Sequence, residues 1–266
     1  MDWLFPLAGL MVGILVGMTG VGGGALMTPL LILGFNVPPI IAIGTDLLFA
    51  AATKTVGTIT HGWQGTVQWR MVALLALGSL PATLLTLQYL AALQTNIETM
   101  DSIVRSTLGV VLFLTAVLLI CRQRLISLVN SCITRRDSNR QNNNSQDSNI
   151  IALLTVLAGV VLGFIVTLTS VGAGAIGIVI LSLLYPRLET AKIVGTDIAH
   201  AVPLTLVAGI GHFQLGSVDT QLLLWLLLGS IPGVYIGSRM SRLMPEKYLR
   251  VVLASILFGV SYQLMT

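Results

Sequence analysis

The chain has 266 residues, of which 55% are hydrophobic and 9% are charged, and its mean hydropathy is +0.92. Soluble domains carry about 25% charged residues, so this composition excludes an ordinary water-soluble protein. The apolar blocks reach the roughly 20 residues that a helix needs to cross a bilayer core, and the short alternating segments typical of a β-barrel are not seen. The sequence therefore predicts an all-α polytopic membrane protein embedded in a lipid bilayer.

Charge and cysteine content bear on further classes of function. The formal net charge is +4, and in a membrane protein Lys and Arg mainly set orientation, so no nucleic-acid partner is expected. Cys121 and Cys132 flank a basic stretch and are expected to be free thiols, with no disulfide and no metal site. The N-terminal "MDWLFPLAGLM" lacks a basic start and a small-residue cleavage site, so we expect it to begin the first membrane segment.

The first apolar segment, Trp3–Leu33, is longer than the roughly 20 residues of one straight span. It contains "TGVGGGALMTP" (Thr19–Pro29), and glycine this dense weakens a helix. We expect two shorter helical pieces that meet at the glycines, either as a re-entrant pair or as two short spans. Three apolar helices are then predicted over Pro39–Thr60, Met71–Leu90 and Ile103–Ile120.

A polar stretch, Arg122–Asn149, follows these helices. Its later part is rich in Asn, Ser and Gln and has too few large apolar residues to fold, which predicts a loose linker. Its arginines predict a cytoplasmic location; they are Arg122, Arg124, Arg135, Arg136 and Arg140.

The rest of the chain repeats its beginning. "LAGLMVGILVGMTGVGGGA" (Leu7–Ala25) aligns with "LAGVVLGFIVTLTSVGAGA" (Leu157–Ala175), 150 residues later, and "IGTDLLFA" (Ile43–Ala50) aligns with "VGTDIAHA" (Val194–Ala201), 151 residues later. Chance similarity between two apolar sequences would not keep Gly, Thr, Asp, His and Pro residues aligned at a nearly constant spacing. We therefore predict a first transmembrane repeat, a linker and a second transmembrane repeat over residues 1–121, 122–149 and 150–266. The second repeat would hold a broken segment, Ile151–Leu184, and helices over Thr190–Gly211, Gln221–Arg239 and Tyr248–Leu264.

Equivalent loops of the two repeats differ in charge. Residues 91–102 contain no Lys or Arg, whereas the equivalent residues 239–250 contain Arg239, Arg242, Lys247 and Arg250. By the positive-inside rule these loops lie on opposite faces, so each repeat crosses the membrane an odd number of times. This predicts two inverted-topology repeats, each a glycine-broken segment plus three transmembrane helices, with both termini outside. Two parallel repeats of four spans are the alternative.

Irregular backbone at membrane depth is tolerated only where protein buries it or where it lines a cavity. Symmetric broken segments in two inverted repeats are typical of a transporter site near the midplane. A helix that begins after such a break presents N–H groups and a positive dipole end to an anion. The substrate-binding candidates are Thr19, Gly20, Gly22, Gly23 and Gly24 in the first repeat and Thr169, Ser170, Gly172 and Gly174 in the second. Tight helix packing is the alternative role for these glycines.

The helix after each break carries ionisable residues, which are costly in a membrane and are functional candidates. On a helix, Lys54 lies about 80° and His61 about 60° around the axis from Asp46, so all three can face one cavity. The second repeat has Thr205 in place of Lys54. Lys54 is expected to bind substrate, and the candidates for coupling or gating are Asp46, Asp197, His61, His200 and His212. The two aspartates could instead position a helix start, and His61 and His212 fall at predicted helix ends, where an interfacial role is favoured.

Motifs for enzymatic chemistry are missing. The sequence has no G-x-S-x-G, no H-E-x-x-H and no Walker A lysine motif. We therefore expect no catalytic residue, no metal and no cofactor, and we expect that the protein is not an enzyme.

The motifs "GMTGVGGGALMTPLL", "IGTDLLFAAATKTVGTITHGWQGTVQW" and "GSLP" resemble the sulfite exporter TauE/SafE family of membrane permeases. The resemblance covers nearly the whole chain, although Ala173 replaces the middle glycine of the second copy and the lysine has no counterpart there. It implies secondary transport of small sulfur-containing anions, such as sulfite or a sulfonate, across the bacterial inner membrane.

The resulting expectation is a multi-pass secondary transporter that exports a small anion, with possible proton coupling. A passive anion channel is the runner-up, and an intramembrane enzyme or a structural partner subunit are further alternatives. The small anion and the lipid bilayer are the expected partners, and the sequence leaves monomer and homodimer both open.

Overall fold

The computed structural model describes residues 4–19, 24–93, 97–137, 146–240 and 246–265, and these form helices with no strand among them. The prediction of an all-α fold is confirmed. Within these described ranges, six helices are long and apolar enough to cross a membrane. In chain order the elements are α1 (Leu4–Thr19), α2 (Gly24–Pro29), the π-helical turn η1 (Leu30–Gly34), α3 (Pro39–Trp63), α4 (Trp69–Leu93), α5 (Ile97–Asp137), α6 (Gln146–Thr169), α7 (Ala175–Leu184), α8 (Thr190–Gln214), α9 (Thr220–Met240) and α10 (Glu246–Met265).

Each glycine-broken segment folds back on itself as a helical hairpin. In the first, the rings of Phe5 at the start of α1 and Phe35 after η1 lie 4.9 Å apart, so the segment returns to the end where it began. In the second, the hydroxyls of Thr155 on α6 and Tyr185 after α7 are hydrogen-bonded at 2.7 Å. Thr155 and Tyr185 are the repeat equivalents of Phe5 and Phe35, so both hairpins are closed at the same place by different chemistry.

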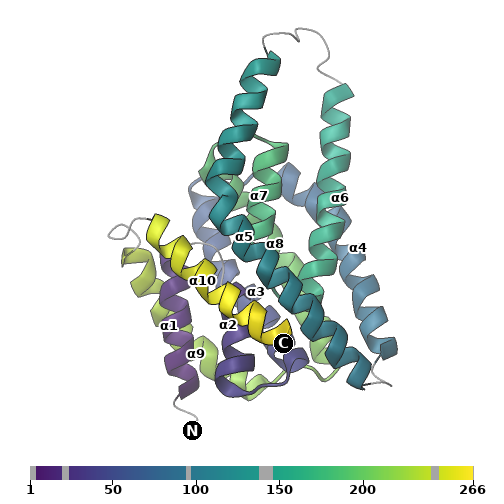
Figure 1. The fold of residues 1–266 in the computed structure, drawn as a ribbon, viewed down its shortest axis with the longest axis vertical. Helices are drawn as coiled ribbons and strands as arrows, with labels where there is room; N and C mark the ends of the chain where they lie inside the picture. The colour runs from purple at the N-terminus through teal and green to yellow at the C-terminus, as the bar shows by residue number, and fades with distance from the viewer. Residues whose placement is uncertain (1–3, 20–23, 94–96, 138–145, 241–245, 266) are drawn as a thin grey trace.

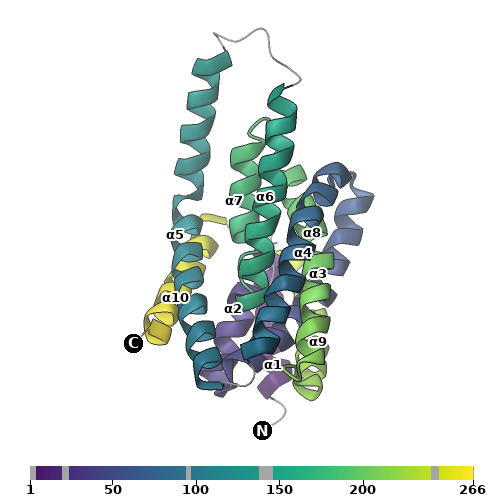
Figure 2. The same ribbon diagram turned by 90° about the vertical axis from the view of Figure 1, so that its right-hand side faces the viewer.

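The two repeats pack by exchanging helices. Helix α1 packs on α9, and their repeat equivalents, α6 and α4, pack on each other. Helix α3 packs on α8, and α5 packs on α10 (Figures 1 and 2). The crossings depend on glycine: a Cβ at Gly9 would overlap the carbonyl oxygen of Leu226, and one at Gly159 would overlap that of Leu75. Close backbone approach through small residues is how membrane helices associate. The glycines at these helix crossings therefore serve packing.

The segment predicted to be a loose linker is largely helical. Helix α5 runs for 41 residues and continues to Asp137, and α6 begins at Gln146. Residues 122–137 and 146–149 are thus helical where a loose chain was predicted, because elongating an existing helix adds a hydrogen bond per residue without a new nucleation cost. Residues 138–145 of the predicted linker lie outside the described residues. Figure 1 shows α5 and α6 extending beyond the other helices, with both chain ends in the opposite half of the molecule.

Candidate functional site

A polar cluster of four ionisable side chains is buried where α3 packs on α8, and a fifth buried one, His212, lies in the last turn of α8. Asp46 and Lys54 come from α3, and Asp197 and His200 come from α8. The exposed fraction of Lys54 is 6%, and that of each of the other three is at most 1%. Charged groups are almost never buried this far without partners. The contacts of this polar cluster therefore decide what it can do.

Lys54 connects the polar cluster to the second hairpin. Its Nζ donates a hydrogen bond of 2.9 Å to the carbonyl oxygen of Ala173, in the break between α6 and α7. The same ammonium interacts electrostatically with the carboxylates of Asp46 and Asp197. The structure thus brings together a cation and two carboxylates that sequence analysis singled out separately, and it does so at a break.

The two aspartates hold the short helices that follow the breaks. Asp46 Oδ2 accepts a hydrogen bond of 2.5 Å from the hydroxyl of Thr28 on α2, and Asp46 also interacts with Ser170 of the second break. Asp197 lies against the first turn of α7, because a Cβ at Gly177 would overlap Asp197 Oδ1. A carboxylate is favourable beside a helix N-terminus, which applies to Asp197 and α7, whereas Asp46 contacts α2 near its C-terminal end. Both contacts agree with a helix-positioning role.

The second break is set by three residues with positive φ. Ser170, Gly172 and Gly174 have φ of 57°, 117° and 124°, and α7 starts directly afterwards. Glycine adopts such angles without the cost that a Cβ brings. The conformation turns the chain at the tip of the hairpin, so Gly172 and Gly174 are required by the backbone.

Fewer donors are open at this break than the sequence led us to expect. The N–H groups of Ile176 and Gly177 both donate to the carbonyl oxygen of Gly172, at 3.1 and 3.2 Å. The hydroxyl of Thr169 donates to Ile165 at 2.7 Å, so its hydrogen is engaged within its own helix. In the first break, Thr19 ends α1 and Gly24 begins α2. The remaining candidates, Gly20, Gly22 and Gly23, lie outside the described residues.

The repeated Gly-Thr-Asp motif joins the two repeats. A Cβ at Gly44 would overlap the carbonyl oxygen of Ser217, so glycine allows the loop before α9 to approach. Thr45 Oγ1 accepts a hydrogen bond of 3.1 Å from the backbone N–H of Asp219. The second copy makes the equivalent bond, from the Gln68 N–H to Thr196 Oγ1 at 3.0 Å. The glycine permits contact and the threonine fixes it, while the aspartate faces the break.

The histidines differ from one another in their surroundings. His61 is partly exposed, with its Nδ1 2.9 Å from Thr66 Oγ1. His212 is fully buried, and its Nε2 is 3.0 Å from the carbonyl oxygen of Thr167. His212 lies in the last turn of α8, the helix end that the sequence indicated, and its interfacial role stays a prediction. Gly44 of α3 leaves room for the Cβ of His212, because a Cβ at Gly44 would lie 3.0 Å from it.

Sequence reasoning missed two side chains that contact the polar cluster. Thr28 binds Asp46, and Ser79 Oγ lies 2.9 Å from His200 Nε2. A signal for Ser79 was present, because "GSLP" and "GSIP" recur in the two repeats and the serine is common to both. Thr28 gave no such signal, since only the fold of the hairpin brings it to Asp46.

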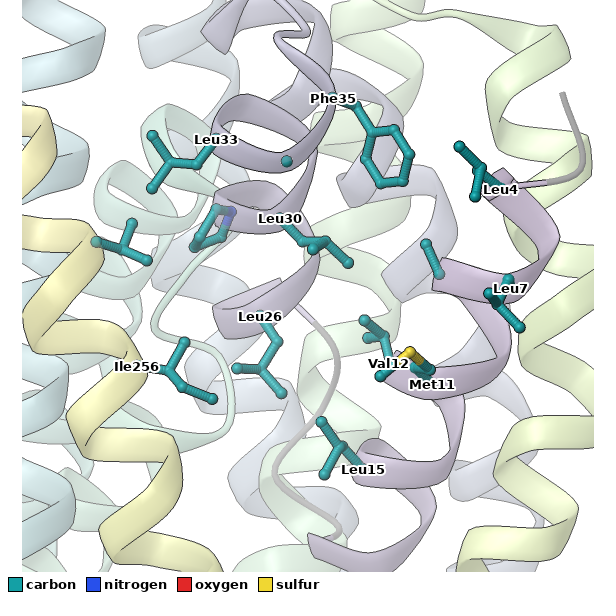
Figure 3. Close-up of a pocket in the computed structure, with 14 residues that line it drawn as sticks. Leu4, Leu7, Met11, Val12, Leu15, Leu26, Leu30, Leu33, Phe35 and Ile256 are labelled. Carbon is teal, nitrogen blue, oxygen red and sulfur yellow. The ribbon is translucent and has the colours of Figure 1, made fainter. Parts of the chain in front are cut away.

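An apolar pocket lies apart from the polar cluster. It has a volume of about 430 Å³ and lies between α1, the α2–η1 arm of the first hairpin, and α10 (Figure 3). Its described lining is entirely apolar and includes Leu7, Met11, Leu30 and Ile256. Sites that recognise an anion need placed polar groups, which this lining does not supply. The polar cluster is therefore the candidate anion site.

Comparison with known proteins agrees with the prediction of a membrane protein. A match to the family described as "Sulfite exporter TauE/SafE" extends over residues 5–264. The "Probable membrane transporter protein YjnA" of Bacillus subtilis is 42% identical over 257 residues, covering 94% of each chain. YdhB of the same organism, which carries the same description, is 28% identical over 93% of this chain and 92% of its own. No solved structure matches the chain. The chain belongs to the sulfite exporter TauE/SafE family and, like the relatives named here, is a membrane transporter with several transmembrane helices.

Proposed function

We propose that this transporter moves a small sulfur-containing anion, such as sulfite or a sulfonate, across the bacterial inner membrane by secondary transport. The observation that carries the proposal is Lys54, a buried ammonium held against the Ala173 carbonyl at the tip of a re-entrant hairpin. A cation in a membrane interior is expensive and is retained where it serves a function. Export is the direction that the family description suggests.

The anion is bound between Lys54 and the second break. Because Ile176 and Gly177 donate within the break, we assign the backbone contacts to the N–H groups of Ala173 and Gly174. These lie at the N-terminal end of α7, where the helix dipole favours negative charge. Glycine at position 174 also keeps side-chain atoms away from the anion.

A proton accompanies the anion. The polar cluster holds one ammonium and two carboxylates, Asp46 and Asp197, that interact with it. While both carboxylates are ionised, they compensate the charge of Lys54. With both carboxylates ionised the three groups sum to −1, and a proton on either carboxylate raises the sum to 0. The proton thus lowers the repulsion of an anion, so anion and proton bind together and leave together.

The two repeats have inverted topology. Each re-entrant hairpin returns to its own side, and three helices follow, which gives three crossings per repeat. The exchange of equivalent contacts, α1 with α9 and α6 with α4, supports a two-fold relationship. The arginine-rich residues 122–149 are cytoplasmic and both termini are outside. Movement of part of one repeat against the other opens the polar cluster to each side of the membrane in turn, which gives alternating access.

Burial of the polar cluster favours a carrier over a passive channel, since a channel would hold its site open to water. The test is uptake into proteoliposomes with sulfite, thiosulfate, sulfoacetate, sulfolactate and carboxylate anions. A carrier shows saturable uptake of one of the sulfur-containing anions and accumulates it under an imposed proton gradient. Flux that only dissipates gradients would establish a channel instead, and no flux of any tested anion would contradict the proposal.

A further inference from the structure

The two repeats differ at the centre of the molecule in two residues that lie together. The equivalent of Lys54 is Thr205, and the equivalent of His200 is Phe49. Lys54 and His200 nevertheless come from different repeats and are close enough to interact electrostatically across the α3–α8 contact. The aspartates are shared by both repeats, so the asymmetry of the polar cluster rests on a lysine and a histidine.

One nitrogen of His200 is already engaged and the other is not. Nε2 lies 2.9 Å from the Ser79 hydroxyl. Nδ1 is buried and has no hydrogen-bond partner among the described residues, on a side chain with no exposed surface. Buried polar atoms are nearly always hydrogen-bonded, so an unpartnered one beside a buried cation indicates a missing ligand. When the Ser79 hydroxyl donates to Nε2, the proton of a neutral imidazole is on Nδ1.

We propose that His200 is a substrate-binding residue whose Nδ1–H donates a hydrogen bond to an oxygen of the anion held by Lys54. This inference rests on the proposed function and adds a specificity residue to it. Lys54 supplies charge, and the imidazole supplies a directional donor that suits the oxygens of a sulfite or sulfonate group. Phe49, at the equivalent position of the first repeat, has no donor, so the anion binds on the α8 side of the contact.

Two substitutions at His200 test the contributions of its two ring nitrogens separately. In His200→Asn the side-chain NH₂ lies near the position of Nδ1, and the contact with Ser79 is lost. In His200→Gln the terminal amide reaches toward the position of Nε2, and the donor at Nδ1 is lost. Ser79→Ala removes the partner of Nε2 and leaves the imidazole in place. Binding of sulfite, thiosulfate and sulfoacetate to the purified proteins would be measured beside their melting temperatures.

We expect His200→Gln to weaken binding of the preferred anion about tenfold or more, while His200→Asn stays within about threefold of wild type. The affinity of Ser79→Ala should lie between those of the two His200 variants. The imidazole stays in place, but the Ser79 hydroxyl no longer fixes its proton on Nδ1. The reverse order, with Gln retaining affinity and Asn and Ser79→Ala losing it, would show that His200 acts through Ser79 and would overturn the inference. Unchanged affinity in both His200 variants would overturn it as well. Wild-type protein that binds none of the three anions would instead count against the proposed function.

Discussion

Lys54 Nζ donates its hydrogen bond to the carbonyl oxygen of Ala173, a residue 119 positions further along the chain. The bond joins the polar helix of the first repeat to the hairpin tip of the second. Alternating access moves repeat-related parts against each other around a fixed site. Any such movement of α3 relative to the α6–α7 hairpin must change the hydrogen bond between Lys54 and Ala173. This hydrogen bond can therefore couple anion binding to the movement.

Thr28 should stabilise the fold through Asp46. Thr28→Val keeps the shape of the side chain but removes the hydroxyl that donates to the carboxylate. Hydrogen bonds to charged groups contribute about 1.5–3 kcal/mol, so we expect a loss of that size in the free energy of unfolding. Thr28→Ser retains the donor and is the control. Equal stability of Thr28→Val and Thr28→Ser in detergent would show that the hydroxyl is not needed to hold α2.

Gly172 should be required for anion binding because of its conformation at the break. Its φ is +117°, and Gly65, in the connection between α3 and α4, has a φ of +65° with open space where a Cβ would lie. Alanine at either position is strained, at a cost of about 1 kcal/mol or more. We expect both Gly172→Ala and Gly65→Ala to lower the melting temperature, and only Gly172→Ala to weaken anion affinity. Equal affinity in the two variants would assign Gly172 to backbone structure alone.

Asp46 and Asp197 should carry the coupling proton. The double variant Asp46→Asn, Asp197→Asn keeps hydrogen-bonding amides but cannot bind or release a proton in this range of pH. In proteoliposomes we expect it to exchange labelled anion across the membrane and to lose the accumulation that an imposed proton gradient drives in wild type. Each single variant shows which carboxylate matters. Undiminished accumulation in the double variant would place the coupling proton elsewhere.

The sequence predicted the fold well where local pattern and repetition carry the information. Hydropathy and glycine content gave the helices α3, α4, α8 and α9 to within a few residues, and the repeat register matches equivalent contacts such as Gly9 with Leu226 and Gly159 with Leu75. The helix period correctly placed Asp46 and Lys54 on one side of α3. Repetition also indicated that the Gly-Thr-Asp motif has a common role in both repeats.

The contacts of the polar cluster could not be predicted, because tertiary packing decides them. No periodicity indicates that Lys54 meets the carbonyl of Ala173, or that His200 meets Ser79 on α4. The N–H group of Ser170, expected to be open at the second break, instead donates to the carbonyl oxygen of Val166 at 2.7 Å. The burial of His212 likewise comes from tertiary packing, in which Gly44 of the other repeat lies beside its Cβ.

Inverted topology predicts the sides on which two equivalent loops lie. In a background lacking Cys121 and Cys132, single cysteines would be introduced within residues 91–102, 239–247 and 122–149. An impermeant maleimide added to intact cells should label the first loop, and the other two should react only after permeabilisation. Labelling of residues 91–102 and 239–247 from the same side would reject the inverted repeat and favour two parallel repeats.

Removing Lys54 has two separable consequences. The substitution Lys54→Ala leaves two buried carboxylates with less compensation, and breaking a buried ion pair costs about 3–5 kcal/mol. Adding Asp197→Asn removes one of those carboxylates and should restore much of the melting temperature. The same double variant should still lack the charge that attracts the anion, so stability and binding can be read independently.

The most direct test of the account is the equilibrium affinity of the purified protein for its anion, measured for wild type, Lys54→Ala, Lys54→Ala with Asp197→Asn, and Thr205→Ala. Thr205 is the repeat equivalent of Lys54, and its hydroxyl donates to Ala201 within its own helix at 2.8 Å. We predict a loss of about tenfold or more, or about 1.4 kcal/mol and above, in both Lys54 variants and little change in Thr205→Ala. Wild-type affinity in the stability-restored Lys54 variant would contradict the account, because the buried cation would then have no part in binding the anion.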